Sequence, residues 1–142
     1  MEPSDLAPAG KFVAAGAALA ALSVALGAFG AHGLKEVLNP ADMETFQTAV
    51  RYQSLHALGI VLIGILLAVA GGREAVILWL NRAGVLLGTG IVIFSGSLYL
   101  LLATGQRWLG AVTPLGGVAF ILGWVALGAA GLRMRRLPRR EA

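Results

Sequence analysis

Four long apolar stretches follow one another along the chain, and none contains Asp, Glu, Lys or Arg. About twenty residues suffice to cross a hydrocarbon core near 30 Å, because an α-helix rises about 1.5 Å per residue. The sequence therefore predicts an all-α membrane protein in which four transmembrane helices form a compact bundle. The predicted spans are residues 12–34, 54–72, 83–106 and 108–132.

The segments outside the spans carry signals of their own. Residues 1–10 contain two acidic residues and two prolines, which predicts a flexible N-terminal segment rather than a basic leader peptide. Asn39 followed by Pro40 is a helix-start signal, and residues 40–53 are predicted to form an amphipathic helical segment on the outer side. Residues 133–142 contain five arginines and are predicted to form a basic cytoplasmic tail.

The distribution of basic residues indicates the orientation of the bundle. With both ends in the cytoplasm, eight of the eleven Lys and Arg residues lie on the cytoplasmic side. Cytoplasmic segments of membrane proteins are enriched in these residues, so cytoplasmic N and C termini are predicted. The cytoplasmic set is Lys11, Arg73, Arg82 and the five tail arginines, and the outer set is Lys35, Arg51 and Arg107.

Composition agrees with a membrane location. Hydrophobic residues make up 58% of the 142 residues and charged residues 13%, and the mean hydropathy is +0.82. A water-soluble fold would lack the polar surface to cover such a chain. The net charge of +4 is concentrated beside the last span, which is typical of a topology signal or an anionic-lipid contact. We therefore expect the lipid bilayer as partner, no nucleic acid, and the bacterial cytoplasmic (inner) membrane as the location.

Polar residues within the spans gather at one depth, near the outer ends of all four helices. Tyr52 and His56 are four residues apart, so their side chains share a helix face. One interpretation is that these groups bond to one another and hold the bundle together. The other is a site for a small molecule or ion, because ionisable groups within spans are functional candidates. The candidate polar cluster consists of His32, Tyr52, Gln53, His56, Ser95, Ser97, Tyr99 and Thr113.

Two histidines near one level raise the question of a metal or haem site. The chain contains no cysteine, and the four spans contain no carboxylate that would complete such a site. The sequence also lacks a Ser–His–acid arrangement, a carboxylate pair and a phosphate-binding loop. We therefore predict no catalytic residues, no cofactor and no metal. Arg51, Tyr52 and Gln53 leave one further possibility open, which is an anionic or polar headgroup.

Four blocks of sequence carry a family resemblance. They are LGAFGAHGLK at 26–35, TAVRYQSLHAL at 48–58, FSGSLYLL at 94–101 and WLGAVTPLGGVAFILGW at 108–124. These blocks resemble domain-of-unknown-function family 423, whose eukaryotic relatives are called transmembrane protein 256. The blocks occur in the family order and touch all four spans. The resemblance implies a four-helix membrane protein, and it supplies no reaction, substrate or catalytic residue.

These observations favour a protein that is not an enzyme and that acts through helix packing. Small residues four apart, such as Gly64 and Ala68, occur on every predicted helix and let helices approach closely in lipid. We expect an accessory or stabilising membrane component, alone, as a homo-oligomer or within a larger membrane complex. The alternative is a small-molecule or ion binder, or a minor transporter, that uses the cluster around His32 and His56. A membrane enzyme or a cytochrome-like protein would require a cofactor.

Overall fold

The structure is a computed structural model that describes residues 3–134. Within this range nearly all residues are helical. The α-helices are α1 (Pro3–Phe29), α2 (Pro40–Ala68), α3 (Glu74–Gly90), α4 (Gly96–Thr104) and α5 (Thr113–Met134). Two π-helical turns and one 3-10 turn join them: η1 (Gly30–Leu34), η2 (Ile91–Ser95) and η3 (Arg107–Ala111). The predicted basic tail lies outside the described residues beyond Met134.

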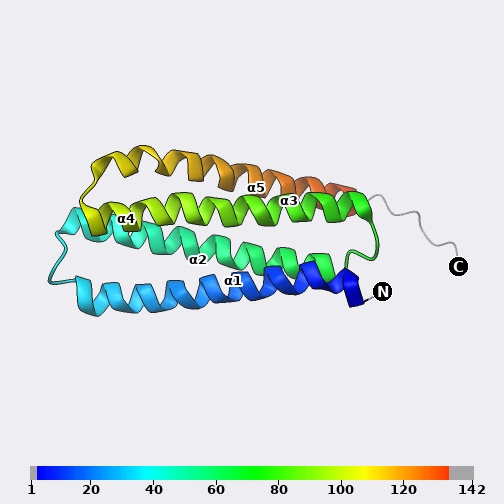
Figure 1. The fold of residues 1–142 in the computed structure, drawn as a ribbon, viewed down its shortest axis with the longest axis horizontal. Helices are drawn as coiled ribbons and strands as arrows, with labels where there is room; N and C mark the ends of the chain where they lie inside the picture. The colour runs from blue at the N-terminus through cyan, green and yellow to red at the C-terminus, as the bar shows by residue number, and fades with distance from the viewer. Residues whose placement is uncertain (1–2, 135–142) are drawn as a thin grey trace, which may run out of the picture.

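Four helical segments run side by side in alternating directions (Figure 1). Each is long and apolar enough to cross a membrane: Pro8–Leu34, Pro40–Ala68, Glu74–Thr104 and Arg107–Met134. The predicted all-α fold with four transmembrane helices is therefore confirmed. Pro3 and Met134 lie at the same end of the molecule, which we call the terminal end. The opposite end carries the connections at 35–39 and 105–106, and we call it the distal end.

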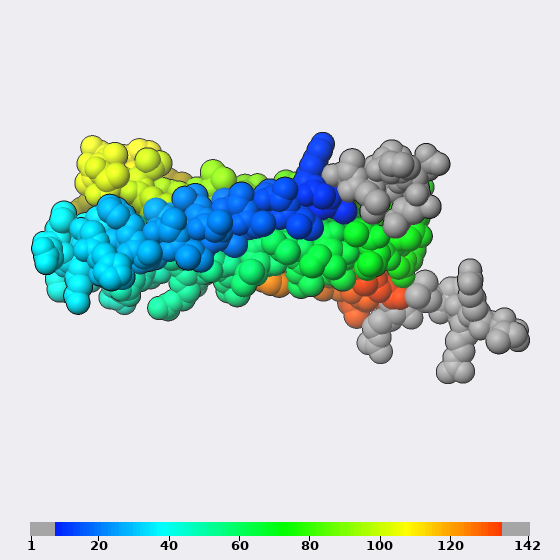
Figure 2. Space-filling view, turned by 90° about the horizontal axis from the view of Figure 1, so that it is seen from below, coloured from blue at the N-terminus to red at the C-terminus, as the bar shows by residue number. Residues whose placement is uncertain are grey.

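The helices pack as two antiparallel pairs that meet along their inner members. α1 packs along α2, α5 packs along α3, and α2 contacts α3 between them. Figure 1 shows α2 and α3 in the middle of the molecule with α1 and α5 outside, and Figure 2 shows α1 running along one face. Only 11% of the most apolar window of α1 is buried, against 44% for α2. Most of the surface of α1 is therefore not covered by the other helices of the chain.

Glycines allow the close contact between α1 and α2. A Cβ atom at Gly16 would lie 2.8 Å from the carbonyl oxygen of Ala57, and one at Gly64 would lie 2.9 Å from the carbonyl oxygen of Ala9. Neither distance leaves room for a methyl group. The two backbones therefore approach as closely as small residues permit, as is common for helix pairs in lipid.

Two helices begin earlier than the sequence indicated. The first helix begins at Pro3, so residues 3–10 of the segment predicted to be flexible are helical. Proline suits the first turn of a helix, because the first N–H groups have no partner within the helix. The third helix begins at Glu74 rather than near residue 83, because a helix does not have to end where the hydrocarbon core ends. Glu74 lies in its first turn, where a negative charge is favourable.

The helix α2 is continuous through the boundary that was predicted near residue 54. Asn39 caps it by accepting a hydrogen bond of 2.9 Å from the backbone N–H of Asp42, and Pro40 is its first residue. Residues 40–53 are therefore helical and continue without a break into residues 54–68 of the same helix.

Candidate functional site

Gln53 joins three helices. Its side chain on α2 is buried, and its Nε2 atom donates a hydrogen bond of 2.9 Å to the backbone carbonyl of Leu19 on α1. Its Oε1 atom accepts a hydrogen bond of 3.0 Å from the hydroxyl of Tyr99 on α4. A primary amide both donates and accepts, so one glutamine can satisfy a partner on each side.

Two serines extend this hydrogen bonding across the distal half of the bundle. The hydroxyl of Ser95, at the end of the π-helical turn η2, donates to the carbonyl of Ala49 on α2 at 2.9 Å. The hydroxyl of Ser97 on α4 lies 2.8 Å from that of Thr113 at the start of α5. Both serines are buried. The turn η2 adds one residue to its helical turn, and this places neighbouring polar residues against different helices.

His56 lies within a stack of aromatic rings instead of this hydrogen-bonded group. Its ring is buried, and its centroid lies 3.4 Å from that of Phe120 on α5 with an interplanar angle of 10°. Its Nδ1 atom lies 2.7 Å from the carbonyl of Tyr52, so Nδ1 carries the hydrogen and donates it. Tyr52 in turn stacks on Phe94 with centroids 4.4 Å apart, and Trp124 flanks the histidine at 6.1 Å.

His32 is not part of either group. It is exposed in the π-helical turn η1 at the distal end of α1. Gly30, two residues before His32, faces the ring of Phe46 on α2, and Phe46 precedes His56 by ten residues, or about 15 Å along the helix. The structure therefore places His32 apart from both groups. The reason is that α1 packs on α2 with its distal turn far from the ring of His56.

The polar atoms of the bundle are satisfied within the described part of the chain. Every fully buried side-chain nitrogen or oxygen atom among these residues has a hydrogen-bond partner. In residues 3–134, no group of three or more His, Asp or Glu side chains has an arrangement that would hold a metal ion. Gln53, Ser95 and Ser97 therefore form hydrogen bonds between helices.

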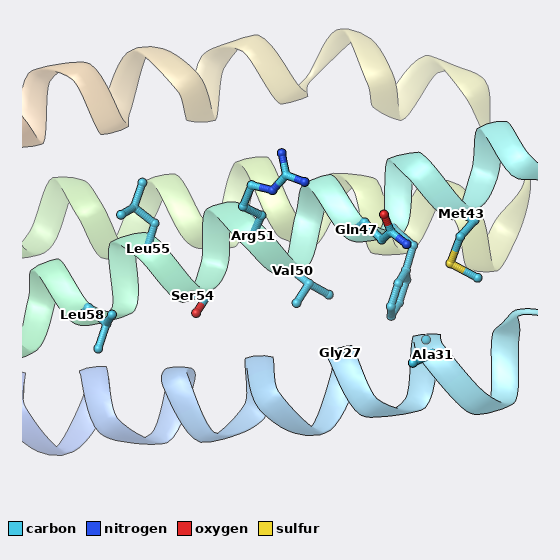
Figure 3. Close-up of a pocket in the computed structure, with 11 residues that line it drawn as sticks. Gly27, Ala31, Met43, Gln47, Val50, Arg51, Ser54, Leu55 and Leu58 are labelled. Carbon is cyan, nitrogen blue, oxygen red and sulfur yellow. The ribbon is translucent and has the colours of Figure 1, made fainter.

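A groove of about 520 Å³ lies between α1 and the first half of α2 (Figure 3). Gly27 and Ala31 form its α1 side. In Figure 3, Val50 and Ser54 point towards α1, whereas Arg51, which also lines the groove, points away from α1 in this view. Arg51 lines this groove and Gln53 does not, although the sequence suggested that the two side chains could share one headgroup.

Comparison with known proteins places the chain in a family. Residues 26–117 match the family described as "Protein of unknown function (DUF423)". The chain belongs to this family. The matched region contains all eight candidate residues, the aromatic ring of Phe94 and the groove residues on both helices.

Curated relatives are similar over most of their length. A UPF0382 membrane protein of Staphylococcus epidermidis is 46% identical over 86% of this chain and 95% of its own. The UPF0382 membrane protein YwdK of Bacillus subtilis is 43% identical over 86% and 96%, respectively. The UPF0382 inner membrane protein YgdD of Escherichia coli is 42% identical over 80% of this chain and 82% of its own. These names state a membrane location and no enzymatic activity, and the predicted location in a cell membrane is confirmed. No solved structure matches the chain.

The sequence did not reveal several partners of the candidate residues. The carbonyl groups of Leu19 and Ala49 accept hydrogen bonds from Gln53 and Ser95, but every residue has such a carbonyl. Phe120 stacks on His56 and Phe94 packs on Phe120, yet aromatic residues in an apolar span carry no pattern that indicates which face they occupy.

Proposed function

We propose that this member of the family is a non-enzymatic accessory or stabilising component of the membrane, which acts through helix packing. The observation that carries the proposal is the use of its buried polar side chains. Gln53, Ser95 and Ser97 bond to other helices or to a partner side chain on them, within the distal half of the bundle. Side chains engaged in this way hold helices together, and each such bond contributes about 0.6 kcal/mol on average in a membrane.

The exposed faces of the outer helices are the surfaces through which such a component would act. Val24 on α1 is 72% exposed and Ile121 on α5 is 64% exposed, so apolar side chains are available to lipid or to another membrane protein. We propose that these faces contact the bilayer, a second copy of the chain or a larger membrane complex. A stabilising role requires a rigid bundle behind them, which the buried hydrogen bonds and the aromatic stack supply.

The proposal is tested at His56, which is also the residue on which a ligand site would depend. We expect His56→Ala to lower the free energy of unfolding by about 3 kcal/mol, because it removes a stacked ring and leaves a cavity. His56→Phe keeps a ring against Phe120 and is expected to change stability by less than about 1.5 kcal/mol. Unfolding of the purified full-length protein in mild detergent is the measurement.

The matched control is Leu55→Ala on the exposed side of the same turn, where Leu55 is 55% exposed and little change is expected. Unchanged stability in His56→Ala would contradict a packing role for this residue. A small molecule that co-purifies with the protein and is lost in both His56 variants would contradict the proposal as a whole, because the phenylalanine keeps the packing and removes only the nitrogen atoms.

A further inference from the structure

Arg51 lies well along α2 from its distal end, within a helix that is long and apolar enough to cross a membrane. It is eleven residues into α2, about 16 Å from Pro40 along the helix axis. Its neighbour Val50 faces Gly27 of α1, which precedes Lys35 by eight residues, or about 12 Å. The apolar half of α1 therefore runs past Arg51 for several turns, and the guanidinium needs a counter-charge at this depth.

The chain itself supplies no counter-charge at that depth. No acidic residue occurs between Glu44 and Glu74, and Glu44 is two helical turns closer to the distal end. Two arginines at the opposite, terminal end have partners. Arg73 donates a hydrogen bond to the carbonyl of Val69, and Arg82 lies over the ring of Trp79. Within the described residues, Arg51 is exposed and takes part in no hydrogen bond or cation–π contact of this kind.

A second copy of the chain does not provide a counter-charge either. Copies inserted in the same orientation place identical residues at identical depths, so Arg51 of one copy would meet only apolar or uncharged side chains, or another arginine, at its own level. An anion that belongs to the bilayer can reach Arg51, because arginine side chains extend towards the interface and lipid headgroups are drawn inwards around them. Figure 3 shows the side chain of Arg51 on the side of α2 away from α1, with its guanidinium leaning towards the distal end.

The groove beside Arg51 has the shape and lining that a lipid requires. Its volume of about 520 Å³ falls within the range of roughly 300–1,000 Å³ that is usual for ligand sites. Met43 and Phe46 line the distal end of the groove on α2. The polar side chains of Gln47, Arg51 and Ser54 lie in its middle part, and Leu55 and Leu58 line its deeper part. The polar middle part and the apolar deeper part match a phosphate and an acyl chain, respectively.

We propose that this groove binds a phospholipid of the distal leaflet. The lipid phosphate accepts hydrogen bonds from the guanidinium of Arg51 and from the amide of Gln47, and one acyl chain lies between Gly27 and Leu58. A guanidinium recognises phosphate by two parallel hydrogen bonds, which a neutral side chain cannot supply. The inference is independent of the packing role proposed above, since none of the buried hydrogen-bonded residues contributes to this groove.

Native mass spectrometry of the full-length protein in mild detergent tests the proposal, with phosphatidylglycerol added in increasing amounts. We expect one retained lipid per chain and a dissociation constant about tenfold higher for Arg51→Gln. Arg107→Gln, at an exposed arginine of the distal end outside the groove, is the charge-matched control and is expected to bind normally. Diacylglycerol with the same acyl chains lacks the phosphate and is expected to bind about tenfold more weakly.

A second pair of variants tests the groove without changing the charge. Ala31→Leu fills the α1 side of the groove and is expected to reduce lipid retention, whereas Ala28→Leu adds the same side chain on an exposed position outside it. Equal lipid binding by the wild type, Arg51→Gln and Ala31→Leu would overturn the proposal. So would binding of inorganic phosphate that depends on Arg51 while phosphatidylglycerol does not bind. Co-purification of another membrane protein that is lost in Arg51→Gln, with lipid retention unchanged, would assign the counter-charge to that protein instead.

Discussion

The hydroxyl of Tyr99 donates a hydrogen bond of 3.0 Å to the side-chain oxygen of Gln53, 46 residues earlier in the chain. The same glutamine donates to the carbonyl of Leu19, so a single side chain connects α4, α2 and α1. These two hydrogen bonds connect both helix pairs, because α1 belongs to one pair and α4 continues the inner helix of the other. The distal half of the bundle therefore depends on one amide with a donor and an acceptor in fixed positions.

Replacement of Gln53 by leucine is expected to lower the free energy of unfolding by about 1–3 kcal/mol, because the hydroxyl of Tyr99 loses its acceptor within a buried region. Tyr99→Phe removes the hydroxyl itself and is expected to cost less. A double-mutant cycle between the two positions should give a coupling energy of about 0.6–1.7 kcal/mol. Thr89→Val, at an exposed position on α3, is the control. A coupling energy of zero would show that the hydrogen bond between Tyr99 and Gln53 does not contribute to stability.

Replacing glycine by alanine is expected to lower the stability of the protein at one position on α1 and to raise it at one position on α4. A Cβ atom at Gly16 would lie 2.7 Å from Cγ2 of Val61, so Gly16→Ala must separate α1 from α2 and is expected to cost about 1–3 kcal/mol. Nothing lies within 4 Å of a Cβ atom at Gly96, so Gly96→Ala is expected to stabilise the helix by up to about 1 kcal/mol. Thermal unfolding of both variants provides the comparison. Similar melting temperatures for the two would contradict the close contact between α1 and α2.

The orientation in the membrane is predicted from the basic residues and is open to a direct test. The chain contains no cysteine, so single cysteines can be introduced without a background signal. Glu36→Cys in the distal connection is expected to react with a membrane-impermeant maleimide in intact cells. Glu74→Cys at the start of α3 is expected to react only after permeabilisation, because the positive-inside rule places the terminal end in the cytoplasm. The reverse pattern of labelling would place both termini outside.

The number of membrane spans was predictable from the sequence because it depends on a local property. Any helix must satisfy its backbone within the segment, so the length of each apolar run decides whether it crosses the bilayer. The same argument could not place the helix ends, since Pro3 and Glu74 begin helices beyond the apolar runs. The position of each polar residue along its helix could also be predicted, by counting residues from the ends of the apolar run.

Only the tertiary structure decided which polar residues meet. Gln53 and Arg51 are two positions apart, yet Gln53 is buried between helices and Arg51 lies at the rim of a groove that faces lipid. His32 and His56 were grouped by depth, but one lies on an exposed turn and the other stacks on Phe120. The physical reason is that the acceptors for Gln53 and Ser95 are backbone carbonyls on other helices, which no residue type marks. Hydropathy determines how many helices cross the membrane, and the packing of their faces determines which side chains become partners.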